Sequence, residues 1–227
     1  MSPTRVATVL AAIAAVAAVH AGASAVAGPA AGPATCDGRP VTVTTNADGA
    51  PIGDADDSIT GTGGPDVIAG LDGNDDIFGG GGDDLICGGT GNDDTGGDGG
   101  NDRVLGEDGN DSVGVSDVGA GDDFLDGGDG RDATYGGPGD DTVKGGPGDD
   151  TGPGGFAGTG QRRIVGGGGN DKLKGGEGKD RLNGNSGKDK IFGEQDNDIM
   201  DGGTASDSCN GGSGKDKAVD CEKVTGV

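Results

Sequence analysis

The sequence has very few of the large apolar side chains from which an ordinary globular core is built. Its 227 residues include no Trp, one Tyr and four Phe, against 57 glycines. Each glycine adds to the conformational entropy that an ordered backbone must lose. An ordinary hydrophobic core is therefore excluded, and the chain must either remain disordered or be held together by something other than apolar burial.

Basic residues and histidine are also scarce. The chain carries 16 Lys and Arg against 40 Asp and Glu, a formal net charge of −24. This balance argues against nucleic acid and anionic membrane surfaces as partners, since both are bound through Lys and Arg. It favours cations instead, and hard divalent cations above all. The only histidine is His20; once the leader described next is removed, His-based catalytic triads and His-ligated zinc are excluded.

The first residues have the pattern of a secretory leader. Arg5 precedes the apolar run VATVLAAIAAVAAV (6–19), and small residues follow it. We expect residues 1–27 to be a signal peptide, cleaved after Ala25 or Ala27, and the mature protein to be secreted into the extracellular space. The apolar run is shorter than the ~20 residues of a membrane-spanning helix, so we expect no membrane insertion.

Between residues 52 and 219 the chain repeats every nine residues. Segments such as GLDGNDDIF (70–78) and GGPGDDTVK (136–144) follow the pattern G-G-x-G-x-D-x-U-x, in which U is apolar. Eighteen such repeats stay in phase, apart from three-residue insertions at 115–117 and 154–156. A sustained period of this kind is typical of calcium-binding parallel β-helices and argues against disorder when calcium is present.

These repeats resemble the RTX, or hemolysin-type calcium-binding, repeat family, and the resemblance covers nearly all of the chain after the leader. It implies an all-β fold, a right-handed parallel β-roll with two nonapeptides per coil, loaded with calcium. The first six residues of each repeat would form a turn and the last three a short strand. Calcium would lie between stacked turns, bound by carbonyl oxygens of the glycine-rich turn and by the Asp in the sixth place.

Seventeen of the eighteen repeats have Asp in the sixth place, and these residues are the predicted calcium ligands. They are Asp57, Asp66, Asp75, Asp84, Asp93, Asp102, Asp111, Asp123, Asp132, Asp141, Asp150, Asp171, Asp180, Asp189, Asp198, Asp207 and Asp216. Aspartate supplies a hard anionic oxygen, and calcium accepts about 6–8 oxygens in loose geometry. Without cations the stacked carboxylates would repel one another, so we expect folding and calcium binding to be one event.

The apolar residue in the eighth place is predicted to form an inner stack. We expect alternate repeats to lie on the same edge, provided that both insertions bulge as loops without shifting the alternation. The two series are then Ile68, Ile86, Val104, Leu125, Val143, Ile164, Leu182, Met200 and Ala218, and Ile59, Ile77, Thr95, Val113, Thr134, Gly152, Leu173, Ile191 and Cys209. The middle of the second series lacks aliphatic side chains, so we expect the middle coils to depend most on calcium.

Four cysteines in an exported chain indicate two disulfides, with three possible pairings. We favour Cys36–Cys87 and Cys209–Cys221, because each would tie a terminal segment to its nearest coils. A structural zinc site is the alternative, although the chain has no CxxC pair. We expect residues 28–51 to form a linker and a cap before the first coil, and residues 220–227 to cap the last coil.

One repeat, AGTGQRRIV (157–165), breaks the rule because Arg162 occupies its sixth place. In one interpretation the guanidinium replaces a calcium ion and pairs with Asp141 and Asp180 on the same edge. In the other the repeat has decayed and Arg162 points into solvent. Both interpretations weaken or remove the calcium positions that would use this turn.

The sequence contains no motif that singles out a catalytic residue. Matches to G-x-G-x-x-G arise from the repeat itself, and carboxylate pairs are so frequent that none stands out as an acid with its base. We therefore expect a secreted calcium-ion-binding protein that folds on binding, and not an enzyme. The alternative is a calcium-stiffened adhesion or surface-matrix protein with a cell-surface or polymer partner.

Overall fold

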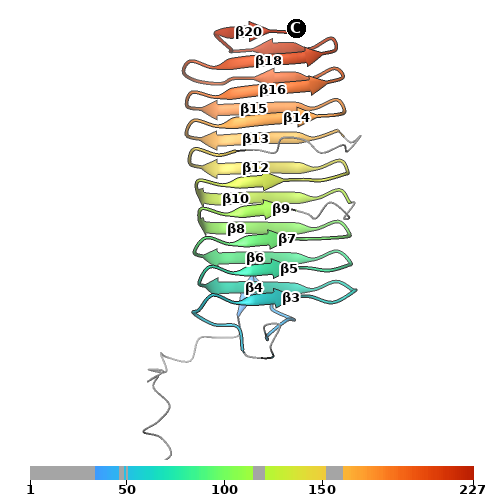
Figure 1. The fold of residues 1–227 in the computed structure, drawn as a ribbon, viewed down its shortest axis with the longest axis vertical. Helices are drawn as coiled ribbons and strands as arrows, with labels where there is room; N and C mark the ends of the chain where they lie inside the picture. The colour runs from blue at the N-terminus through green and yellow to red at the C-terminus, as the bar shows by residue number, and fades with distance from the viewer. Residues whose placement is uncertain (1–33, 46–48, 50, 115–120, 152–160) are drawn as a thin grey trace, which may run out of the picture. The chain divides into compact units, whose positions relative to one another are not determined.

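The chain folds as a stack of parallel β-strands in successive coils of a solenoid (Figure 1). The computed structural model describes residues 34–45, 49, 51–114, 121–151 and 161–227. Among them there are strands and turns but no α-helix, and hence no helix that could cross a membrane. The predicted all-β parallel β-roll is confirmed, whereas the predicted leader and both insertions lie outside the described residues.

One side of the solenoid is a nine-stranded parallel sheet. Its strands, in spatial order, all come from alternate repeats. They are β4 (Val67–Asp72), β6 (Leu85–Thr90), β8 (Arg103–Gly109), β10 (Phe124–Gly130), β12 (Thr142–Pro147), β13 (Arg163–Gly168), β15 (Arg181–Ser186), β17 (Ile199–Asp201) and β19 (Lys217–Val219).

The remaining repeats form the opposite side, as a five-stranded and a four-stranded parallel sheet. The first contains β3 (Ser58–Thr60), β5 (Asp76–Phe78), β7 (Asp94–Gly96), β9 (Ser112–Gly114) and β11 (Ala133–Tyr135); the second contains β14 (Lys172–Gly176), β16 (Lys190–Gln195), β18 (Ser208–Ser213) and β20 (Lys223–Thr225). Thr151 connects the two through isolated bridges to Ala133 and Lys172.

The strand register shows that alternate repeats stack on the same side throughout. Most paired residues are 18 positions apart, such as Ile68 and Ile86. Across each insertion the separation becomes 21, as for Val104 and Leu125, and the pairing continues on the same sheet. The prediction that the insertions leave the alternation unchanged is therefore confirmed.

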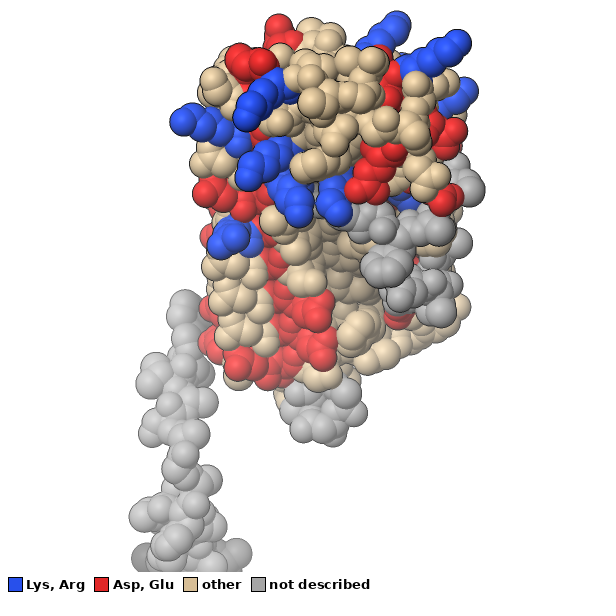
Figure 2. Space-filling model, turned by 45° about the horizontal axis from the view of Figure 1, so that its top comes forward, with Lys and Arg blue, Asp and Glu red and all other residues tan. Residues whose placement is uncertain are grey.

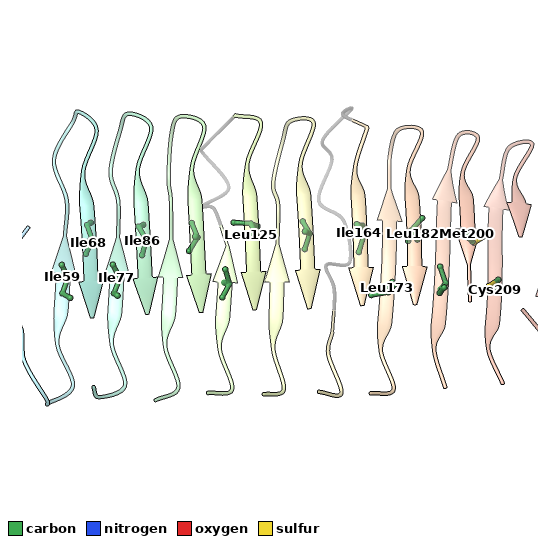
Figure 3. Close-up of a cluster of buried hydrophobic side chains, with 14 residues drawn as sticks. Ile59, Ile68, Ile77, Ile86, Leu125, Ile164, Leu173, Leu182, Met200 and Cys209 are labelled. Atoms are coloured by element: carbon green, nitrogen blue, oxygen red, sulfur yellow. The ribbon is translucent and has the colours of Figure 1, made fainter. Parts of the chain in front are cut away.

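The eighth-place side chains form the core between the two sides (Figure 3). Both predicted series are present, and Ile68, Leu125 and Ile191 are fully buried. Thr95 and Thr134 are also buried in the stack, and Gly152 lies outside the described residues. Each buried aliphatic side chain stabilises the fold by about 1.5–3 kcal/mol, but each repeat contributes only one such position, so the core is narrow.

The N-terminal segment packs on the outer face of the first coils. A short antiparallel hairpin of β1 (Thr35–Cys36) and β2 (Arg39–Pro40) is tied to β6 by the disulfide Cys36–Cys87. Cys36 and Cys87 are buried with Val67, Ala69 and Leu85 in a second apolar cluster, against which Val41 and Leu105 also pack. This predicted disulfide is therefore present, and it joins the hairpin to the solenoid.

The C-terminal segment continues the solenoid. The second predicted disulfide, Cys209–Cys221, is present. Beyond it, β20 pairs in parallel with β18, and Val224 lies opposite Cys209 in the register of the eighth place. Residues 220–227, predicted as a cap, therefore contain the strand of one further partial repeat.

Candidate calcium sites

The sixth-place aspartates lie immediately before the strands and stack into two ladders, one along each edge. Asp66, Asp84, Asp102, Asp123, Asp141, Asp180, Asp198 and Asp216 precede the strands of the nine-stranded sheet; Asp57, Asp75, Asp93, Asp111, Asp132, Asp150, Asp171, Asp189 and Asp207 follow the other side. All except Asp57 and Asp216 are buried. The fold thus places all seventeen predicted ligands on two lines parallel to the solenoid axis.

From Asp75 and Asp84 onward, one oxygen of each ladder carboxylate ties its coil to the preceding one. The backbone N–H of Asp84 donates to Asp102 Oδ1 at 2.9 Å, and that of Asp132 donates to Asp150 Oδ1 at 2.8 Å. The same bond recurs along both ladders. Because the acceptor is a carboxylate, such bonds are stronger than those between neutral groups.

The second oxygen of most of these carboxylates is buried without a hydrogen-bond donor. This holds for Oδ2 of Asp75, Asp84, Asp93, Asp102, Asp111, Asp132, Asp141, Asp150, Asp171, Asp180, Asp189, Asp198, Asp207 and Asp216. A buried anionic oxygen without a partner is strongly unfavourable. Its recurrence along both ladders fits a series of cation sites, and at Asp141 the positive group is the nearby guanidinium of Arg162.

The first-place glycine forms a cradle for such a group. A Cβ on Gly70 would collide with Asp75 Oδ2 and with the carbonyl oxygen of Gly88 in the next coil. Two acceptor oxygens therefore converge on the space that a side chain would fill. Carboxylate and carbonyl oxygens are the ligands that calcium prefers, so the donor set fits this ion.

The fourth-place glycine permits the close stacking of the turns. Gly91 has φ +131°, and a Cβ there would collide with the carbonyl oxygen of Gly73 in the preceding coil. Any other residue would be strained and would push the coils apart. The first-place glycine thus lets acceptor oxygens approach one another, and the fourth-place glycine lets neighbouring coils stack closely.

Burial and mutual repulsion disfavour the charged form of the ladder carboxylates. Burial raises the pKa of Asp84 and of Asp102, with a smaller contribution from the neighbouring ladder charges, to about 6. The pKa of Asp150 rises to about 7 through burial, with contributions from the charges of Asp171 and Asp132. A bound cation would oppose both effects, because a nearby positive charge favours the ionised carboxylate.

The first aspartate of each ladder differs from those that follow. Oδ2 of Asp57 accepts a hydrogen bond from the Gly53 N–H at 2.9 Å. Oδ2 of Asp66 accepts from the backbone N–H and the hydroxyl of Thr62, at 2.6 and 2.8 Å. Thr62 stands where the consensus has the second glycine, so protein donors take the role of a cation at this end of the ladder.

Glu222 ends one ladder at the C-terminus and was not among the predicted site residues. Its Oε2 accepts the hydrogen bond of the Asp207 N–H at 2.5 Å, as a sixth-place Asp would. It follows Asp207 by 15 residues, outside the nonapeptide period. Glu222 could have been found in the sequence from the apolar Val224, which follows it by two residues as the eighth place of a repeat follows the sixth.

A second, outer ladder of fifth-place side chains was also missed. Asn92 donates to Asn74 Oδ1 from its backbone N–H at 2.8 Å and from Nδ2 at 3.1 Å, and Asn110 bonds to Asn92 in the same way. These side chains are exposed. They hold neighbouring turns in register next to the calcium ladder.

Arg162 lies inside the ladder of the nine-stranded sheet. Its side chain is 3% exposed, and its Nε lies 3.6 Å from Asp141 Oδ2 in an ion pair. Its Nη1 donates to the carbonyl oxygen of Gly175 at 2.8 Å, and its Nη2 to that of Gly137 at 2.7 Å. The interpretation in which Arg162 points into solvent is therefore wrong.

The guanidinium occupies the position that a cation would take. Gly175 is the first-place glycine of the next coil on this edge, equivalent to Gly88 beside Asp75. Asp180 contacts Arg162 through the backbone, because its Oδ1 accepts from the Arg162 N–H at 2.8 Å. The pKa of Asp141 is nevertheless about 6, since burial outweighs the opposing charge of Arg162.

Side chains alone do not complete a metal site at any of these turns. Within the described ranges no three His, Cys, Asp or Glu side chains converge on one point. Consecutive ladder aspartates belong to different coils, and the oxygens nearest to a first-place glycine such as Gly70 are one carboxylate oxygen and one backbone carbonyl oxygen. Any ion in the ladder must therefore use carbonyl oxygens as well as carboxylates.

Comparison with known proteins agrees with this geometry. No curated protein matches the chain. The family model for the RTX calcium-binding nonapeptide repeat matches residues 52–86, 60–95, 96–113, 117–143, 135–151, 158–191 and 183–218. These segments together cover most of the chain and coincide with the coils that carry the two aspartate ladders. The chain therefore belongs to the RTX family of calcium-binding nonapeptide-repeat proteins.

Proposed function

We propose that this chain is an exported calcium-binding protein whose two aspartate ladders bind Ca²⁺ between stacked turns and whose β-roll folds as the ions bind. The observation that carries the proposal is the row of buried Oδ2 atoms without donors, each next to a first-place glycine. RTX repeats bind calcium through a β-roll. The positions of these oxygens indicate which residues would bind it here.

The proposed ligands at each turn are one ladder carboxylate and carbonyl oxygens of adjacent coils. At Asp75 these include Oδ2 and the Gly88 carbonyl oxygen. Calcium suits such a site because it tolerates variable geometry and takes many oxygens, whereas Mg²⁺ demands a compact octahedron and retains its water. Asp57 and Asp66 would contribute least, because protein donors already occupy their Oδ2 atoms.

Coupled folding follows from the balance between the narrow core and the dense charge. Residues 37–165 carry 28 acidic against 6 basic residues, and the ladders stack many of these charges about 4.8 Å apart. One buried aliphatic side chain per repeat must offset both this repulsion and the ordering of a glycine-rich backbone. Calcium would neutralise the charge and join the coils, so its binding energy would become folding energy.

Export and a non-enzymatic role complete the proposal. The leader pattern at 1–27 and the two disulfides support an oxidising, extracellular location. The ladder carboxylates have a structural use, and the only histidine is in the leader, which supports a binding rather than a catalytic function. Calcium modules outside cells commonly work at ~10⁻⁴–10⁻³ M, so the protein would fold after export.

Calcium titration followed by far-UV circular dichroism tests the proposal. We expect a cooperative gain of β-signal with Ca²⁺ and little gain with the same concentration of Mg²⁺. The double variant Asp132→Asn/Asp150→Asn should need roughly tenfold more calcium, if each lost charge contributes about 0.7 kcal/mol. Asp94→Asn, on the exposed outer face, is the matched control and should behave as the parent protein. An equally strong β-signal in excess chelator would contradict the proposal.

The raised pKa values predict that the stability of the metal-free fold and the affinity for calcium change in opposite directions with pH. The pKa of Asp84 rises from 3.8 to about 6 in the fold, so between these values the metal-free fold binds more protons than the unfolded chain. Its stability is therefore greatest at low pH and falls as the pH rises through about 6. Calcium must displace these protons, so calcium affinity should rise over the same range. Titrations on both sides of pH 6 check this; a calcium affinity independent of pH would contradict it.

Arg162→Asp restores the consensus and should convert the fixed cation into a calcium site. Native mass spectrometry should count at least one additional bound ion. Arg162→Met is the matched control: it should gain no ion, and it should destabilise the calcium-loaded protein by about 3–5 kcal/mol, because it leaves Asp141 buried without its partner. An unchanged ion count in Arg162→Asp would show that the guanidinium does not occupy a calcium position.

A further inference from the structure

The outer face of the five- and four-stranded sheets carries one continuous line of seventh-place side chains, which we call the outer row. Strand pairing places its members side by side from coil to coil, about 4.8 Å apart. The outer row reads Ser58, Asp76, Asp94, Ser112, Ala133, Thr151, Lys172, Lys190, Ser208 and Lys223. All of these except Ser208 are exposed.

Two like-charged pairs are stacked in this row. Asp76 pairs with Asp94, and Lys172 pairs with Lys190. Like charges directly opposite on neighbouring strands are unfavourable. None of the four side chains forms an ion pair with another residue in the described part of the chain. The outer row therefore presents two uncompensated charge pairs of opposite sign.

The outer row is self-complementary about Ala133. At equal numbers of coils on either side of Ala133, the matched residues are Ser112 and Thr151, Asp94 and Lys172, Asp76 and Lys190, and Ser58 and Ser208. A two-fold axis running along β11 would bring each aspartate of one copy opposite a lysine of another. The same surface patch on both subunits is the requirement for a symmetric dimer.

Two aromatic ninth-place side chains on this face are related by the same symmetry. Phe78 lies three coils before β11, and Phe192 lies three coils after it. Phe78 is 38% exposed, more than any other aromatic side chain in the described ranges. The two-fold axis would bring it opposite Phe192 of the second copy, where the rings could stack. On the axis itself the seventh-place residue is the small Ala133, and the ninth-place Tyr135 of each copy would lie opposite its own symmetry mate.

The acidic part of this face is also hollowed. A groove runs over β5, β7 and β9. It is lined by Asp76, Asp94, Ser112 and Ala133 of the outer row and by neighbouring ladder residues, and its one basic lining residue is Arg131. Exposed lysines of a second copy would enter this groove. On the face that Figure 2 displays, Lys and Arg gather over the C-terminal part, interspersed with Asp and Glu, and an acidic patch lies below them.

The opposite face of the solenoid lacks this pattern. The seventh-place residues of the nine-stranded sheet include Arg103, Arg163, Arg181 and Lys217 but no carboxylate. Its first coils are covered by the N-terminal hairpin. Self-complementarity is thus a property of one face and does not follow from the repeat.

We propose that the outer row is the interface of a homodimer, in which two calcium-loaded copies pack antiparallel, face to face, about a two-fold axis along β11. This dimer rests on the proposed calcium binding, because ions in the ladders reduce the repulsion between two highly acidic chains. The contact is about 38 Å long by strand spacing and about 10 Å wide by strand length. It is therefore small and polar, which predicts a weak, salt-sensitive dimer.

Charge reversal with mixing tests the dimer. One variant is Asp76→Lys/Asp94→Lys and the other is Lys172→Asp/Lys190→Asp. Between Ser58 and Ser208, the symmetric part of the outer row, each variant presents charges of a single sign. Each alone should therefore remain monomeric in sedimentation velocity at concentrations where the parent protein dimerises. Mixed together, they should form a heterodimer tighter than the parent dimer. High salt should dissociate both dimers.

The matched control reverses a stacked pair on the other face, Arg163→Asp/Arg181→Asp, and should dimerise as the parent protein does. Circular dichroism and ion counts of all variants separate loss of the dimer from loss of calcium-dependent folding. A parent protein that is monomeric at all accessible concentrations while fully calcium-loaded would overturn the proposal. Failure of the mixed variants to associate, or loss of dimerisation in the control, would also overturn it.

Discussion

The whole structure depends on how each sixth-place carboxylate divides its two oxygens. One oxygen accepts a backbone N–H from the neighbouring coil and sets the register, as Asp102 does for Asp84. The other is buried beside a carbonyl oxygen with no donor in reach. The first interaction specifies the geometry and the second makes that geometry unfavourable until a cation is present. A single side-chain type thus sets the register of the coils and supplies the proposed calcium ligands.

The ladders show three solutions to the same electrostatic problem. Along most of their length, a carboxylate oxygen and a carbonyl oxygen converge beside a first-place glycine, which is the arrangement proposed to bind an ion. At the N-terminal end, Thr62 supplies two donors to Asp66. At Arg162 a guanidinium donates to two carbonyl oxygens and faces Asp141. Because the second and third solutions need no metal, we expect them to define the least calcium-dependent points of the solenoid. Arg162 interrupts the row of aspartates on one edge. On the other edge the row is continuous at the same height, where the Asp150 N–H donates to the Asp171 carboxylate.

Most of the fold could be predicted from the sequence because a nine-residue period repeats the same local chemistry many times. The repeat predicts that Ile68 stacks on Ile86 and that alternate repeats form opposite sides of the solenoid. The positions of the cysteines favour the two disulfides that are present. The details that break the period could not be predicted. Glu222 completes a ladder at a spacing of 15 residues, and the partners of Arg162 are mainly carbonyl groups, which every residue carries. The Asn74–Asn92–Asn110 ladder occupies a place in which many residue types occur, so its pattern is weak in one sequence.

The most direct test of the account is to locate the ions in crystals grown with calcium, by anomalous scattering. The account predicts peaks between stacked turns on both edges, each next to a sixth-place Oδ2 and a first-place glycine carbonyl oxygen, with no peak at the Arg162 guanidinium. Ions bound instead along the exposed fifth-place ladder, or ladder aspartates such as Asp84 and Asp150 with no ion beside them at saturating calcium, would contradict it.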